Sequence, residues 1–213
     1  MCLLTLMLTS ALANATSVSY YLDQTNAQPR LSDGINYLQV TISDAAFGLD
    51  ANAIRFDVTL LSPLTSIADS NFGIQSFGFN SNVPTAPVLA AIAGLPPGWS
   101  AGDDINQDGF GNFELVVDGM GLNRQNPTLT IYITGIAGDT PATYVAPSNG
   151  SAGEGNVFFT ANVAGFTDQD PGAGVLTSAY FGGSQAVPLP ATAWLFVTGF
   201  SGLARWARRR RTP

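Results

Sequence analysis

A short stretch of acidic and amide residues is the part of this chain whose spacing best suits chemistry. Residues 103 to 114 read Asp-Asp-Ile-Asn-Gln-Asp-Gly-Phe-Gly-Asn-Phe-Glu. They contain the Asp-x-Asn-x-Asp-Gly pattern of calcium loops, in which alternate oxygen-bearing side chains converge on a hard cation and glycine permits the sharp turn. The predicted Ca²⁺ ligands are Asp104, Asn106, Asp108, the carbonyl oxygen of Phe110, and Glu114.

The same segment has a second interpretation. If Asp104 is position one, the bidentate acid of an EF-hand belongs at Leu115, one residue after Glu114, and no helical pattern flanks the loop. A calcium loop of another geometry stays open. The alternative, which we favour, is a tight turn between two strands in which Gly109 and Gly111 adopt positive φ angles.

Composition excludes several catalytic classes. The chain has no His and no Lys, and its only cysteine is Cys2. A Ser-His-Asp or Cys-His nucleophile, a Schiff-base lysine and the usual Cys/His zinc site are therefore ruled out for the body of the chain. A glycoside hydrolase would pair Asp104 or Asp108 with Glu114, but carboxylates so close in one loop are more often solvated or metal-bound. We therefore expect a protein that is not an enzyme.

Aromatic residues offer another kind of contact. Trp99 follows a Pro-Pro-Gly turn, and its ring could stack on a sugar. A lone Trp in this place more often fills the edge of a core. The same two interpretations apply to four tyrosines that we expect to be exposed: Tyr20, Tyr21, Tyr37 and Tyr144.

Charge is distributed very unevenly. All fifteen acidic residues precede Val187, whereas five of the eight arginines follow it, so the body carries fifteen acids against three arginines, about −12. Such a body repels phosphate, and we expect no nucleic-acid partner.

The elements that must position these residues are short strands. Runs of β-type residues are separated by Gly, Pro, Asn and Asp clusters. In the segment 54–60, Ile, Phe, Val and Leu alternate with Arg, Asp and Thr, as in a half-buried strand, and Leu129, Ile131 and Ile133 repeat the pattern. The predicted strands are 17–22, 37–43, 54–61, 74–79, 113–117, 129–134, 157–163 and 175–181, with 88–95 a strand or a helical turn. We expect an all-β, antiparallel β-sandwich, jelly-roll-like or immunoglobulin-like.

The two ends of the chain differ from this body. Residues 3–8 are apolar and lead to small-residue cleavage sites after Ala13 or Ala15, so we expect residues 1–15 to be a signal peptide. Residues 16–186 form the predicted β-sandwich passenger. Residues 187–213 form a third unit, with a proline motif, an apolar run and an arginine cluster.

The apolar run of this third unit is short for a membrane helix. Residues 191–204 span about 21 Å at ~1.5 Å per residue, against a hydrocarbon core of ~30 Å. Flanking residues make a single transmembrane helix feasible, and the arginines predict a cytoplasmic C-terminus. The residues expected to retain the helix in the membrane are Trp194, Arg205, Arg208, Arg209, Arg210 and Arg211.

This ending resembles the PEP-CTERM sorting signal of Gram-negative bacteria, in its Val-Pro-Leu-Pro-Ala variant. The motif residues are Val187, Pro188, Leu189, Pro190 and Ala191, where Leu189 stands in place of the family's usual Glu. The resemblance covers the last 27 residues and implies export, retention of the helix in the inner membrane, and cutting near the proline motif by an exosortase-type transpeptidase. Delivery to the cell surface or to an exopolysaccharide matrix would follow. The body is similar to the β-sandwich passengers often attached to such tails.

The sequence thus predicts an exported protein with a structural or adhesive role in the envelope or exopolysaccharide. One alternative is a carbohydrate-binding module that uses Trp99 and surface tyrosines, with calcium as structural support. The other is the carboxylate-based glycoside hydrolase.

Overall fold

The computed structural model describes residues 17–48, 50–119, 127–170 and 174–187. The predicted signal peptide lies outside this part of the chain, as do the sorting motif after Val187 and the predicted C-terminal helix. Within the described residues, no helix has the length and apolar character needed to cross a membrane.

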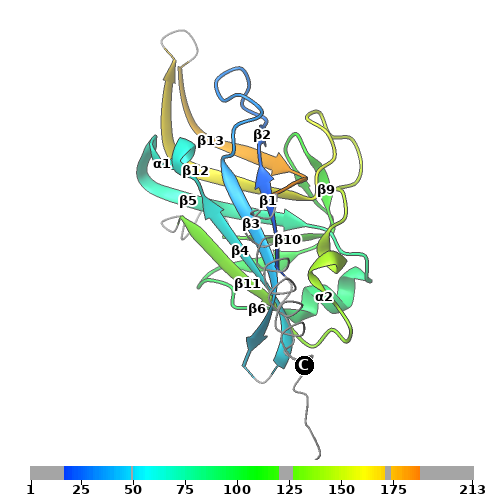
Figure 1. The fold of residues 1–213 in the computed structure, drawn as a ribbon. Helices are drawn as coiled ribbons and strands as arrows, with labels where there is room; N and C mark the ends of the chain where they lie inside the picture. The colour runs from blue at the N-terminus through cyan, green and yellow to red at the C-terminus, as the bar shows by residue number, and fades with distance from the viewer. Residues whose placement is uncertain (1–16, 49, 120–126, 171–173, 188–213) are drawn as a thin grey trace, which may run out of the picture.

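Most of the described chain forms two antiparallel sheets of six strands each (Figure 1). In spatial order, sheet A contains β14 (Gln185–Ala186), β1 (Ser17–Leu22), β3 (Leu38–Phe47), β4 (Asp50–Leu60), β11 (Thr128–Ile133) and β6 (Ile92–Ala93). Sheet B contains β2 (Gln24–Thr25), β13 (Gly174–Gly183), β12 (Phe159–Asp170), β5 (Ala68–Phe79), β10 (Leu115–Asp118) and β7 (Ser100–Gly102). The predicted all-β, antiparallel class is confirmed.

Smaller elements connect or cover these sheets. A two-stranded hairpin is formed by β8 (Ile105–Gln107) and β9 (Gly111–Phe113). Short helices are α1 (Ser62–Thr65), α2 (Thr85–Ala91) and the 3₁₀ turn η1 (Pro141–Tyr144). The segment 88–95, predicted to be a strand or a helical turn, contains both, because α2 ends at Ala91 and β6 follows directly.

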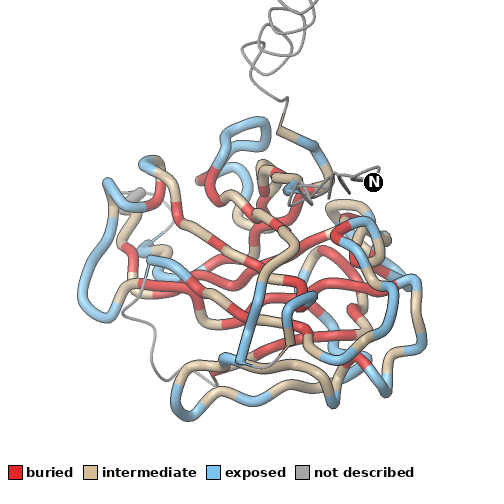
Figure 2. Tube along the Cα trace, turned by 60° about the horizontal axis from the view of Figure 1, so that its bottom comes forward, coloured by how far each residue is buried: buried red, intermediate tan, exposed pale blue. Residues whose placement is uncertain are grey.

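The main core lies between the two sheets (Figure 2). Buried positions alternate along β4, whereas in sheet B residues 115–117 of β10 and 159–164 of β12 are buried consecutively. Phe56 of sheet A lies with its ring centroid 4.7 Å from that of Phe79 and 6.1 Å from that of Phe77, both in sheet B. Tyr144 of η1 is fully buried and contacts Phe56 edge-on at 5.5 Å. Burial of these rings supplies much of the driving force for a domain that has no disulfide.

All eight firmly predicted strands contain observed strand residues. The inward face predicted for 54–60 is confirmed, since Ile54, Phe56, Val58 and Leu60 are all at most 5% exposed. The predicted strand 113–117 is divided, because Phe113 ends β9 and β10 begins at Leu115. Several strands extend past the predicted limits, notably β5 and β12, whose added residues are largely polar.

Candidate functional site

The acidic segment folds as the β8–β9 hairpin. Asn106 pairs with Asn112, and the turn is closed by a hydrogen bond from the Phe110 backbone N–H to the Gln107 carbonyl at 2.8 Å. Gly109 has φ 88° and Gly111 has φ 84°. These angles lie in the left-handed region that glycine tolerates, so the tight turn predicted with both glycines at positive φ is confirmed.

Side chains within the hairpin bond to one another. The Asn112 amide donates to Asp104 Oδ1 at 3.2 Å, and the Asn106 amide donates to Asn112 Oδ1 at 3.0 Å. Asp108 Oδ2 accepts from the Asn26 amide at 3.1 Å. Asp104 itself has φ 49°, which an aspartate tolerates better than most residues. Protein donors thus already contact side-chain oxygens of two predicted calcium ligands, Asp104 and Asp108, while a third, Asn106, donates its own amide N–H to Asn112.

Phe110 anchors the hairpin to the rest of the molecule. Its side chain is fully buried in a second, smaller core formed with Phe113, Val116 and Val157. Its carbonyl oxygen, the predicted backbone ligand, accepts a 2.6 Å hydrogen bond from Ser148 Oγ. At Glu114, the backbone N–H donates to Asn80 Oδ1 at 2.7 Å. The Phe110 side chain thus anchors the turn in the smaller core, and Gly109 and Gly111 provide the positive φ angles on either side of it.

Phe110 and Phe113 pack on the outward face of sheet B, where two glycines leave room for their rings. A Cβ built on Gly182 of β13 would lie 2.6 Å from the Phe110 ring, and one on Gly78 of β5 would lie 3.1 Å from the Phe113 ring. Ser76 Oγ donates to Gln107 Oε1 at 3.1 Å beneath the same hairpin. The two glycines are thus matched to two phenylalanines that are distant in sequence.

Among the described residues, no group of three or more His, Cys, Asp or Glu side chains is arranged to hold a metal ion. Neither of two surface clefts, of about 770 and 260 Å³, includes a residue of the hairpin. Calcium binding and the carboxylate pair stay predictions of the sequence, and the confirmed turn accounts for the spacing of Asp, Asn and Gly.

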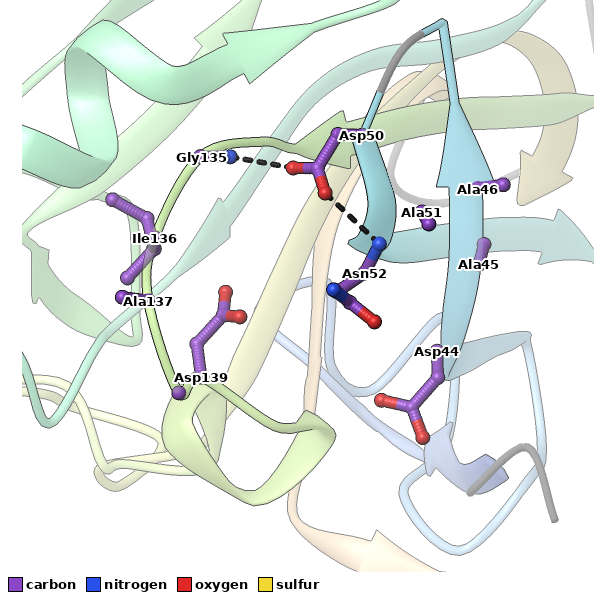
Figure 3. Close-up of a pocket in the computed structure, with 11 residues that line it drawn as sticks. Asp44, Ala45, Ala46, Asp50, Ala51, Asn52, Gly135, Ile136, Ala137 and Asp139 are labelled. Atoms are coloured by element: carbon purple, nitrogen blue, oxygen red, sulfur yellow. Dashed lines mark hydrogen bonds between the residues drawn. The ribbon is translucent and has the colours of Figure 1, made fainter. Parts of the chain in front are cut away.

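The larger cleft carries three carboxylates that sequence reasoning did not bring together (Figure 3). Asp44 comes from β3, Asp50 from the start of β4, and Asp139 from the loop after β11. In the sequence, Asp50 and Asp139 each lie near a glycine, Gly48 and Gly138, which does not connect them, and only the fold makes them neighbours.

Two of these carboxylates fasten the loop 135–139. Asp50 accepts hydrogen bonds from the backbone N–H groups of Gly135, at 2.6 Å, and Asn52, at 2.9 Å, and both lower its pKa. Burial raises the pKa of Asp139; a 2.7 Å hydrogen bond from the Tyr144 hydroxyl acts in the opposite direction, and the charges of Asp50 and Asp44 raise it further. Because Asp50 and Asp139 already accept protein hydrogen bonds, we interpret this arrangement as one that holds the loop 135–139 in place.

Aromatic residues proposed to contact glycan are mostly inside the molecule. Trp99 is half-buried and packs against the main core, and its buried indole N–H has no hydrogen-bond partner within the described chain. Exposure was wrongly expected for Tyr20, Tyr37 and Tyr144, which are 8%, 2% and 0% exposed. Their inward strand positions and the Tyr144 bond to Asp139 explain the error, and Tyr21 alone of the four is partly exposed.

The start of the predicted sorting motif is attached to sheet A. Strand β14 pairs with β1 at Tyr20 and Tyr21, and the Val187 backbone N–H then donates to the Ser19 carbonyl at 2.8 Å. The first described strand, β1, is therefore paired with the last one, β14. Comparisons with protein-family models, curated proteins and solved structures found no match.

Proposed function

We propose that this chain is an exported passenger protein, sorted to the cell envelope or extracellular matrix by its C-terminal segment, where it has a structural or adhesive role. The observation that carries the proposal is the sorting-signal pattern of residues 187–213, with its proline motif, short apolar run and arginine cluster. The proposed exosortase-type transpeptidase would act at Val187 to Ala191, while the arginines keep the tail on the cytoplasmic side.

The ends of the folded part agree with this proposal. The last described strand, β14, ends at Ala186, directly before the motif. Because β14 pairs with β1, Ser17 and Ala186 lie in neighbouring strands at the same edge of sheet A. A transpeptidase that cuts within residues 187–191 would therefore leave β14 and the main core in the mature domain.

A reporter experiment tests the sorting step. Residues 187–213 are fused to a neutral exported reporter and expressed in a host that has an exosortase system. We expect the reporter to be shortened and moved to the cell surface or matrix. A matched fusion in which Pro188 and Pro190 are both replaced by Ala should stay uncut. A wild-type fusion that remains uncut and soluble would overturn the sorting proposal.

Finer features of the sandwich remain predictions of the sequence. These are its jelly-roll-like or immunoglobulin-like subclass and calcium as a structural ion at the hairpin. Neither is required for the proposed role, because the hairpin is anchored by Phe110 and by protein hydrogen bonds.

A further inference from the structure

The outward face of sheet A is a nearly uncharged array of hydroxyl groups. Its four central strands, β1, β3, β4 and β11, are paired in register, so outward side chains form rows across the sheet. Within 17–21, 39–43, 55–59 and 128–132, each outward residue is Ser, Thr or Tyr, apart from Gln39 and an Arg55–Asp57 ion pair. We call these outward residues the hydroxyl face.

The middle row of this face is held in place by its own hydrogen bonds. Ser19 Oγ and Thr41 Oγ1 lie 2.8 Å apart, and Thr130 Oγ1 donates to Asp57 Oδ1 at 2.7 Å. Arg55 contacts both Asp57 oxygens at 2.8 Å, so the two charges neutralise each other. Threonine has few side-chain rotamers to lose, and side chains already fixed reduce the entropy cost of binding.

Aromatic rings lie at opposite corners of the array. Tyr21 is at the β1 end of one row, and Tyr132 is in β11 in another. Tyr132 stacks with Phe47, whose exposed fraction is 36%, at a centroid distance of 4.3 Å. Such rings present apolar surface beside hydroxyl groups, a combination that suits the C–H faces and hydroxyls of a sugar.

The two outward faces of the sandwich differ in what covers them and in their residue types. The hairpin and its phenylalanines cover the part of the sheet B face around Gly78 and Gly182, where the glycines leave room for the rings. The hydroxyl face has partly exposed side chains and almost no apolar residue, so it lacks the apolar centre of a stable protein interface. Its net charge is zero although the body carries about −12, so nothing on it attracts an anionic polymer.

We propose that the hydroxyl face binds a neutral, linear polysaccharide. Side-chain hydroxyls both donate and accept hydrogen bonds, as sugar hydroxyls do, and in a sheet they recur at about 4.8 Å between strands and about 6.8 Å along a strand. A repeating polymer can use such a lattice over several units, whereas a small ligand cannot. The inference rests on the proposed matrix role and names the ligand class for it, at a site distinct from Trp99.

The test uses the purified full-length chain in detergent and three insoluble neutral glucans or mannans: amorphous cellulose, curdlan and linear mannan. Depletion of protein from solution measures binding, and alginate beads serve as the anionic comparison. Thr41→Glu, which adds a charge at the middle row, should weaken binding about tenfold, equivalent to ~1.4 kcal/mol. The same change at an exposed position of sheet B, Thr177→Glu, should leave binding unchanged, as should Thr41→Ser and Trp99→Ala.

Thr128→Glu, at the exposed start of β11, replaces Thr41→Glu if thermal unfolding shows that the latter does not fold. The proposal is overturned if the wild-type chain binds none of the three polysaccharides, if it binds alginate as tightly, or if Thr177→Glu weakens binding as much as the face variant does. These outcomes are independent of the reporter result. A sorted reporter with no polysaccharide binding removes this inference alone, and binding by a chain whose tail does not sort removes only the sorting proposal.

Discussion

The contact between Phe110 and Gly182 offers a direct test of how the hairpin is attached to sheet B. Phe110 is fully buried, and a Cβ at Gly182 would lie 2.6 Å from two of its ring carbons. Gly182 has an ordinary backbone conformation for an L-residue, so Gly182→Ala adds no φ strain and its cost must come from the ring. Overpacking of this kind costs about 1–3 kcal/mol, and truncation of a buried Phe to Ala costs about 3–5 kcal/mol.

The double variant separates this contact from the general cost of each change. Once Phe110→Ala has removed the ring, the added methyl of Gly182→Ala occupies the vacated space. Alanine is also less costly than glycine in a strand by about 0.5–1 kcal/mol. We therefore expect Gly182→Ala to be neutral or slightly stabilising in the Phe110→Ala background, with a coupling free energy of about 1–3 kcal/mol between the two sites.

Urea unfolding of the four proteins, followed by tryptophan fluorescence, gives the free energies of unfolding for this cycle. Gly153→Ala is the matched control, because nothing lies within 4 Å of a Cβ at that glycine and its φ is ordinary; a shift within about 0.5 kcal/mol is expected. If Gly182→Ala destabilises both backgrounds equally, or if Phe110→Ala costs less than about 1 kcal/mol, the hairpin is not anchored by this ring.

Two further predictions concern charge. Burial raises the pKa of Asp139 in the folded state, so ionisation of this carboxyl opposes folding. The protonated carboxyl therefore contributes its full stability below the unfolded pKa of 3.8, and this contribution is lost as pH rises through the folded pKa. Asp139→Asn, which can still accept the Tyr144 hydrogen bond, should unfold at equal or higher urea than wild type at pH 7 and show no advantage near pH 3.5; a clear loss at pH 7 would contradict this. For calcium, thermal unfolding with and without millimolar Ca²⁺ should give the same Tm, because the hairpin is already closed by protein bonds; a calcium-dependent rise that disappears in Asp108→Asn would restore the calcium interpretation.

The sequence was sufficient for the parts of the fold that follow from period-two alternation. Ile54, Phe56 and Val58 identify their strand and its buried face without any structural information, because an inward residue recurs at every second position. The extensions of β5 and β12 were missed because their added residues are mostly polar or exposed, and the backbone pairing that makes them strands is set by neighbours. Strands of two or three residues, such as β2 and β7, exist only through such pairing.

The candidate site was predictable only in part. Gly109 and Gly111 were identifiable as turn residues, because positive φ is a local property of the chain. The burial of Phe110 was not, because it depends on Gly182, more than seventy residues away. The same holds for Tyr144, which looked like a surface tyrosine until Asp139 and the core around Phe56 were placed beside it.

The hairpin and the hydroxyl face together suggest why this chain carries so little charge on its sheets. On sheet B, aromatic anchors and glycine gaps occupy the part of the outward face that the hairpin covers, around Gly78 and Gly182. On sheet A the outward positions are free of that constraint, yet the acidic residues of the body lie mostly in turns and at strand ends, and Asp57 is neutralised by Arg55. A solvated face needs only polar residues of mixed sign, so confining charge to one internal pair on a lattice of hydroxyls is better explained by an uncharged polymer that must lie flat on it.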